Sequence, residues 1–312
     1  MKPIARWSAI AVVVMATVAA AVGVATTDYK VVAGWGELPA GMTWGEVPGV
    51  SLDRTGTIVA FRRVEPPILE FSASGKLLKS WGQGLFVMPH GLRVDRDGFI
   101  WATDARAADG KGQQVFKFSR DGRVVLTLGT AGVSGDSPTT FNGPCDVAVA
   151  PNGDVFVADG HVNARVVKFS KDGTYLTSWG RKGSGPGEFD VPHAIAIDSR
   201  GRVLVGDRNN KRIELFDQDG RFLEQWTQFG RPSGIFIAPE AMSATRRALS
   251  WAARATAVWP VSLPARCRKA LPWRQTATSM PAKPRRGTRC ASWLPPPART
   301  VCALAIPVRD PI

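Results

Sequence analysis

Residues 192–207 have the sequence PHAIAIDSRGRVLVGD. A proline opens the segment, an apolar run follows, a glycine-containing turn interrupts it, and a second apolar run ends at an aspartate. Two short apolar runs joined in this way are typical of an antiparallel hairpin. Residues 89–104 and 144–159 repeat the layout as PHGLRVDRDGFIWATD and PCDVAVAPNGDVFVAD. The sequence therefore contains a repeated strand pair.

The repeated unit is longer than one hairpin. Five copies begin at prolines whose spacings along the chain are 41, 55, 48 and 40 residues: Pro48, Pro89, Pro144, Pro192 and Pro232. Further apolar runs, with Asp-Gly turns at 121–122, 172–173 and 219–220, give the unit a third and a fourth strand. No segment has a sustained helical period. Units of this length with four strands predict an all-β propeller over residues 26–239.

The N-terminal segment differs from the repeats. Lys2 and Arg6 precede an uncharged apolar run over residues 7–25, which ends in the small residues Gly-Val-Ala. This pattern predicts a secretory signal peptide at 1–25, with a single membrane anchor as the alternative. In either case the folded part is expected to be exported, to the periplasm or the extracellular space.

The C-terminal segment 240–312 also departs from the pattern. It holds ten of the 23 prolines and 13 of the 40 Lys and Arg residues, but no Phe or Tyr and only 2 of the 26 acidic residues. We predict a basic, disordered tail that does not pack as a blade. A shifted reading frame in the coding DNA is the favoured explanation, and a genuine basic extension is the alternative. The rest of the chain has 27 basic and 24 acidic residues, and this near balance argues against nucleic-acid binding.

The chain has three histidines, and their places in the repeat are informative. His90 and His193 each follow the proline that opens a unit, and His161 follows the second strand of another unit. Because first and second strands are antiparallel, all three histidines are expected at one end of the propeller. His90 and His193 are candidate zinc ligands, or else loop histidines that bond to nearby backbone. Cys145 is the one cysteine of the repeats, and no cysteine spacing indicates a metal motif.

These segments resemble NHL-repeat propellers, and among them the peptidyl-α-hydroxyglycine α-amidating lyases, over about residues 31–238. That family has six blades, so the resemblance implies six, of which five are recognisable and the last is disrupted. It places zinc ligands at His90 and His193, and substrate-binding arginines at Arg63 and Arg208. The family's catalytic tyrosine falls on His161, which we assign as a catalytic base or a ligand. No histidine follows His193, so the family's third zinc histidine has no counterpart.

The resemblance implies metal-assisted cleavage of a C–N bond, giving a peptide amide and glyoxylate. One alternative is a non-catalytic propeller that binds a ligand or a protein on the histidine-bearing face. Another is a calcium-dependent, lactonase-type enzyme, for which Asp104, Asp159 and Asp207 are candidate ligands unless they only fix the following turns. We expect a monomer that binds a small peptide or other small molecule on this face. Nucleic acid is not expected as a partner, and a membrane only through the N-terminal segment.

Overall fold

The computed structural model describes Val32 and residues 34–237 of the 312-residue chain. In this part the chain forms strands and no helix, grouped into four antiparallel sheets of four strands each. The first sheet holds β1 (Gly49–Leu52), β2 (Ile58–Phe61), β3 (Ile68–Phe71) and β4 (Leu77–Trp81), and the second β5 (Pro89–Val94), β6 (Ile100–Ala108), β7 (Lys111–Phe118) and β8 (Val124–Leu128). The third holds β9 (Pro144–Val149), β10 (Val155–Asp159), β11 (Arg165–Phe169) and β12 (Tyr175–Trp179), and the fourth β13 (Pro192–Ile197), β14 (Val203–Asp207), β15 (Arg212–Phe216) and β16 (Phe222–Trp226).

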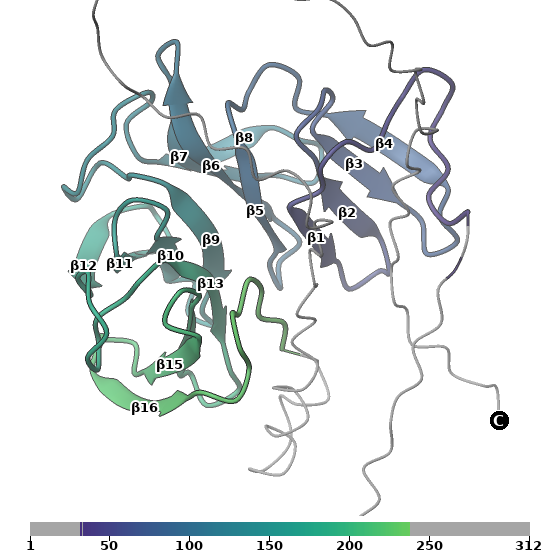
Figure 1. Cartoon of the computed structure of the whole chain (residues 1–312). Coiled ribbons are helices and arrows are strands. Elements are labelled where there is room, and N and C mark those ends of the chain that lie inside the picture. The colour runs from purple at the N-terminus through teal and green to yellow at the C-terminus, as the bar shows by residue number, and fades with distance from the viewer. Residues whose placement is uncertain (1–31, 33, 238–312) are drawn as a thin grey trace, which may run out of the picture. The chain divides into compact units, whose positions relative to one another are not determined.

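The sheets are successive blades of a propeller. Within each sheet the strands lie in chain order, and the first strands of neighbouring sheets contact one another: β1 with β5, β5 with β9, and β9 with β13 (Figure 1). The first strand of each blade is therefore the inner one. This arrangement confirms the all-β propeller predicted from the repeats.

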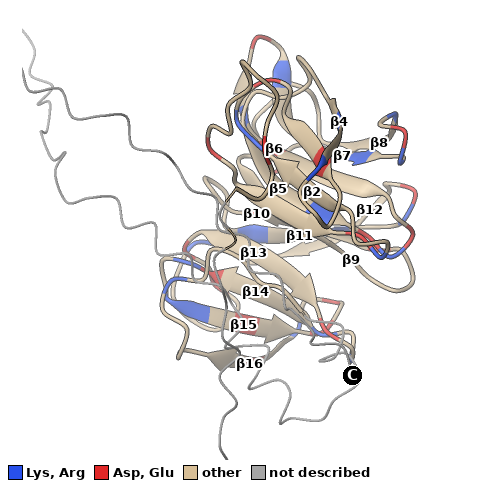
Figure 2. Ribbon diagram, turned by 90° about the vertical axis from the view of Figure 1, so that its right-hand side faces the viewer, with Lys and Arg blue, Asp and Glu red and all other residues tan. Residues whose placement is uncertain are grey.

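Hydrophobic side chains fill the space between blades. Between the first two blades, Phe61 and Ile68 pack with Phe118, and equivalent clusters lie between the later pairs. Such burial is the main favourable term in folding, at roughly 25 cal/mol per Å² of apolar surface. Each cluster draws on two sheets, so a blade is stabilised by its neighbours. In Figure 2 basic and acidic residues lie interspersed in the hairpin loops, and some lie on strands such as β11 and β15.

The Asp-Gly turns close the outer hairpins as predicted. Gly220 has a φ of +85°, a backbone conformation that residues with a side chain rarely adopt. A Cβ atom at this position would also come within 2.6 Å of the Trp179 ring on the neighbouring blade. Glycine is therefore required here both for the turn and for the packing between blades.

The fifth unit that the repeat predicts at Pro232 is described only as far as residue 237. Residues 232–237 form no strand, but Ile235 is buried and packs with Ala194 and Ala196 of β13. The predicted signal peptide at 1–25 and the predicted tail at 240–312 lie outside the described residues. No helix of the described part is long and apolar enough to span a bilayer.

A buried ion pair fixes the loop that follows the second strand in the third and fourth blades. In the fourth, the Asp207 carboxylate accepts bonds from the Arg212 Nε (3.0 Å) and from the Asn210 side chain (2.7 Å). The Arg212 guanidinium also donates to the backbone carbonyls of Ser184, Gly185 and Glu188. Asp159 and Arg165 repeat the pair in the third blade.

These carboxylates, and that of Asp104, are engaged in holding their own loops. Both Asp104 oxygens accept backbone N–H groups of residues 87 and 88, and both oxygens of Asp159 and Asp207 also accept hydrogen bonds. The contacts favour the turn-fixing role over a calcium site. They also position two candidate residues, because His161 and Arg208 lie just beyond Asp159 and Asp207.

We predict that Arg212→Met lowers the free energy of unfolding by about 3–5 kcal/mol, because it leaves the buried Asp207 carboxylate without its cation. The control is Arg221→Met, which removes an exposed pair with Asp217 and should cost about 1 kcal/mol at most. Urea denaturation followed by tryptophan fluorescence measures both. Equal losses in the two variants would contradict the structural role of the buried pair.

Candidate metal centre

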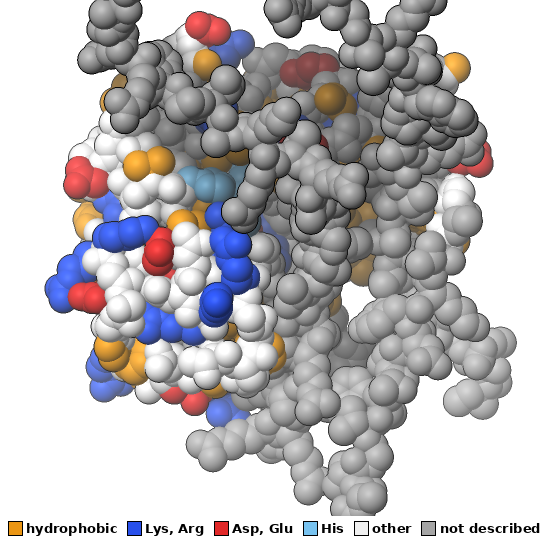
Figure 3. All heavy atoms as spheres, viewed as in Figure 1, with side chains coloured by type: hydrophobic (Ala, Val, Ile, Leu, Met, Phe, Trp, Pro, Cys, Tyr) orange, Lys and Arg blue, Asp and Glu red, His pale blue; other side chains and the backbone are white. Residues whose placement is uncertain are grey.

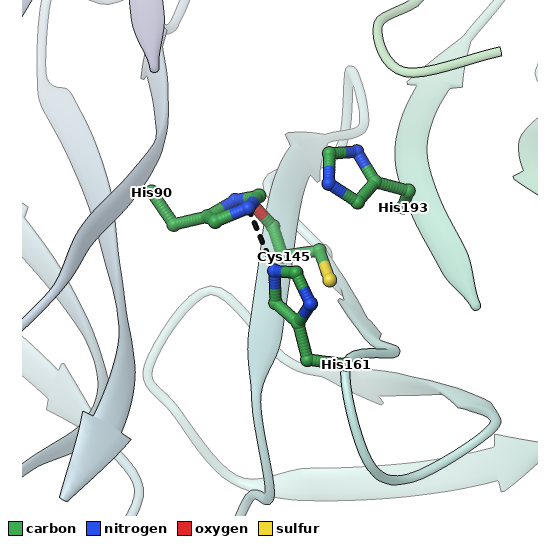
Figure 4. A group of neighbouring side chains, drawn as sticks. All are labelled: His90, Cys145, His161 and His193. Carbon is green, nitrogen blue, oxygen red and sulfur yellow. Dashed lines mark hydrogen bonds between the residues drawn. The ribbon is translucent and has the colours of Figure 1, made fainter. Parts of the chain in front are cut away.

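Three histidines far apart in the sequence meet at the inner end of the second, third and fourth blades. His90 lies on β5, His193 lies on β13, and His161 follows β10 after Gly160 (Figure 4). The centroid of the His90 ring is 4.6 Å from that of His161 and 4.8 Å from that of His193. The prediction that all three face one end of the propeller is confirmed.

Cys145, on β9, joins the three histidines. The nitrogen and sulfur atoms that these four residues can offer all lie within 4.8 Å of one another. From the sequence, Cys145 was expected to be an isolated cysteine. The repeat held a signal for it, because Cys145 follows Pro144 just as His90 follows Pro89.

Two of the imidazoles are oriented by backbone carbonyls. The Nδ1 atom of His90 lies 2.7 Å from the Cys145 carbonyl oxygen, and that of His193 lies 2.9 Å from the Ser233 carbonyl oxygen. A carbonyl only accepts, so each Nδ1 carries the proton and donates it. Each Nε2 is then left with a free lone pair, which is the form in which histidine binds metal ions.

The third imidazole faces the first. His161 Nε2 lies 2.8 Å from His90 Nε2. Because His90 Nε2 holds a lone pair, His161 Nε2 donates a proton to it in this arrangement. A metal ion would bind the same lone pair of His90 Nε2 in place of that proton. The donor set of imidazole nitrogens and a thiol suits zinc and similar ions, so the residues fit the metal that the family resemblance implies.

Burial keeps these imidazoles uncharged. Desolvation lowers the pKa of His90 and of His161 to about 4 and that of His193 to about 2, and the positive charge of Arg208 contributes to all three shifts. Neutral imidazole is the species that coordinates metals, so at neutral pH protons do not compete for these ligands. Burial raises the pKa of the Cys145 thiol.

The two predicted arginines lie beside the histidines. The charges of Arg63 and Arg208 both lower the pKa of His90. Arg63 donates from Nε to the Pro89 carbonyl at 3.2 Å and pairs with Glu46. The buried Nε of Arg208 has no hydrogen-bond partner among the described residues, so this cation has unused donor capacity. Arg106, which sequence reasoning missed, also lowers the pKa of His161 by its charge.

The face of the molecule at this site is partly open. Figure 3 shows histidine side chains at the surface between hydrophobic ones, with Lys and Arg side chains nearby. His90 is only 7% exposed, whereas His161 and His193 are partly exposed. A small anionic ligand could therefore approach the imidazoles from outside and meet positive charge there.

Comparisons with known proteins agree with this architecture. A family model described as a 6-bladed beta-propeller matches residues 147–228. The probable peptidyl-alpha-hydroxyglycine alpha-amidating lyase of Caenorhabditis elegans is 34% identical over 194 residues, which cover 54% of this chain and 54% of the relative. Human NHL repeat-containing protein 3 is 35% identical over 193 residues, which cover 59% of this chain and 55% of the relative.

The chain is similar to the amidating lyases and to NHL-repeat proteins. It is also similar to peptidyl-glycine alpha-amidating monooxygenase B of Xenopus laevis, at 36% identity over 198 residues. These residues cover 53% of this chain and 22% of the relative. The chain thus spans between about a fifth and about half of these relatives. Among solved structures, a streptogramin B lyase aligns with a TM-score of 0.50 at 18% identity, over 64% of this chain and 62% of the other, a likeness in fold alone.

The buried histidine cluster is expected to make the metal-free protein sensitive to acid. The pKa of His90 is about 4 in the folded protein and ordinarily 6.5, so the unfolded chain binds the proton more readily. The contribution of His90 to the free energy of unfolding therefore becomes increasingly unfavourable as the pH falls from 6.5 to 4. With a chelator present, the free energy of unfolding should decline less steeply over this range in His90→Gln than in the unmodified protein.

The unmodified protein has to be compared with His90→Gln, because buried carboxylates change the free energy of unfolding with pH in the opposite direction. Burial raises the pKa of Asp146, so its protonation favours the folded state at low pH. This contribution is common to both proteins and drops out of the difference. Parallel curves for the two proteins between pH 6.5 and 4 would show that His90 is not held neutral by the fold.

Proposed function

We propose that this chain is an exported, metal-dependent lyase that cleaves peptidyl-α-hydroxyglycine into a peptide amide and glyoxylate. The observation that carries the proposal is the convergence of three neutral imidazoles beside Arg208, whose guanidinium has a buried N–H without a partner in the described structure. The similarity to amidating lyases supports the choice of substrate class. Fold alone would not, because propellers carry many functions.

His90 and His193 are the residues that would hold the metal ion, since their Nδ1 bonds leave both Nε2 atoms free. When bound, a zinc ion supplies a Lewis acid that makes the substrate hydroxyl more acidic. The carbonyl groups of Cys145 and Ser233 fix the orientation of the two rings before any ligand arrives. This preorganisation reduces the ordering that binding would otherwise require.

His161 is the proposed base. Its Nε2 lies 2.8 Å from His90 Nε2, beside the place where a substrate hydroxyl would lie. With a metal ion on His90 Nε2, the His161 proton would be on Nδ1, and His161 Nε2 would be free to accept a proton. Because its pKa is about 4, His161 is a weak base at neutral pH. It can take a proton efficiently only from a hydroxyl made more acidic than in water. His161 and the metal ligands therefore have to act on the same oxygen.

The bond changes follow from that proton transfer. The hydroxyl oxygen forms the C=O bond of glyoxylate while the C–N bond breaks. The electron pair of the C–N bond remains on nitrogen. The nitrogen then takes up a proton and becomes the terminal amide. Arg208 would hold the substrate carboxylate through paired N–H donors, with Arg63 contributing a second positive charge.

We expect the purified full-length chain to contain about one zinc ion per molecule, and His90→Ala and His193→Ala to contain almost none. Mass-spectrometric metal analysis after dialysis measures the content, and release of glyoxylate from an α-hydroxyglycine peptide measures turnover. Zinc bound at full occupancy without turnover would favour the alternative of a non-catalytic binding propeller. Turnover that survives both substitutions would contradict the proposed site.

We further expect Arg208→Met to lower kcat/KM roughly 30-fold or more, since removing one partner of a buried charge pair costs about 2 kcal/mol at least. Arg200→Met is the matched control, because Arg200 is exposed in the hairpin at the other end of β13. With a substrate analogue that has no carboxylate, the two variants should have similar kcat/KM values. If Arg208→Met and Arg200→Met behave alike, Arg208 does not bind the substrate.

A further inference from the structure

Three neighbouring blades place a metal-binding side chain at the same position. His90, Cys145 and His193 each follow the proline that begins the inner strand of a blade, on β5, β9 and β13. The inner strands contact one another in this order. The repeat therefore delivers these three side chains to one point, whereas His161 reaches the same point from a loop of the third blade.

Two side chains of the second blade bond to the backbone of Cys145. Its carbonyl oxygen accepts the Nδ1–H of His90 at 2.7 Å and the hydroxyl of Thr103 at 3.2 Å. Its side chain is completely buried, forms no disulfide, and makes one weak contact from Sγ to the Gly143 carbonyl at 3.4 Å. Figure 4 shows the sulfur pointing between His161 and His193.

From this geometry we infer that Cys145 is the third protein ligand of the metal, beside His90 and His193. The inference rests on the metal binding of the proposed function and supplies the ligand that the sequence lacks after His193. The thiol would give up its proton and bind as thiolate. Two imidazoles and one thiolate leave a fourth position open for substrate, as catalytic zinc sites do. His161 remains unbound and available as the base.

A packing role for Cys145 is the competing explanation, because buried cysteines often behave as small apolar residues. The two explanations differ in the spectrum of a substituted metal. Cobalt(II) bound to a thiolate has a sulfur-to-metal charge-transfer band in the near ultraviolet, and cobalt(II) bound only by nitrogen and oxygen has none. A packing residue would contribute no such band.

The test uses the full chain with Cys267, Cys290 and Cys302 replaced by serine, so that Cys145 is the one remaining thiol. Cobalt(II) is added to the metal-free protein, and the same titration is made with Cys145→Ser and His161→Gln in that background. We expect the charge-transfer band in the parent and in His161→Gln, and its loss in Cys145→Ser. The dissociation constant of zinc should rise at least tenfold in Cys145→Ser, since loss of even an outer partner of a metal ligand costs about 10–100-fold.

The parent protein gives a second measurement that needs no folded variant. X-ray absorption at the zinc edge should show one sulfur neighbour at roughly 2.3 Å together with nitrogen neighbours at about 2.0–2.1 Å. Bound metal with no band and no sulfur neighbour would overturn the inference, and so would a band lost in His161→Gln but kept in Cys145→Ser. A band in protein without lyase turnover would support the inference while contradicting the proposed function, so the two failures are distinguishable.

Discussion

The hydrogen bond from His90 Nδ1 to the Cys145 carbonyl is the contact on which the site depends. It crosses from the second blade to the third at the inner end of the sheets. The bond assigns the tautomer of His90 and directs its Nε2 toward His161 and His193. His193 makes the corresponding bond to Ser233, the residue after the proline of the next unit. The orientation of the His90 and His193 rings therefore results from hydrogen bonds to the next unit of the repeat.

The loops carrying the other site residues are fixed by charge rather than by apolar packing. The Asp159–Arg165 and Asp207–Arg212 pairs are buried, and each arginine also satisfies several carbonyls of the preceding loop. A buried ion pair of this kind contributes little net stability compared with apolar residues, but removing one partner is costly. The pairs thus enforce one loop conformation, and that conformation places His161 and Arg208.

Positive charge and burial act together on the imidazoles. Desolvation alone would keep them neutral, and the nearby arginines strengthen the effect. The same arginines would attract a carboxylate that approaches from the open side. Neutral imidazoles keep their lone pairs available for a metal ion, and the arginines favour an anionic ligand. The proposed lyase chemistry would use both properties, although His161 stands where the resemblance places a tyrosine.

Residue patterns along the chain were enough to predict the strands, the hairpins, the blade order and the end of the propeller at which the histidines lie. Periodic alternation and glycine turns are local, and equivalent positions in a repeat acquire equivalent places in space. Three facts emerge only from the folded chain: Cys145 joins the histidines, His161 Nε2 lies next to His90 Nε2, and Arg106 lies near enough to lower the pKa of His161. Those facts depend on side-chain rotamers and on the packing of one blade against the next. Neither is encoded in the spacing of residues along a single strand.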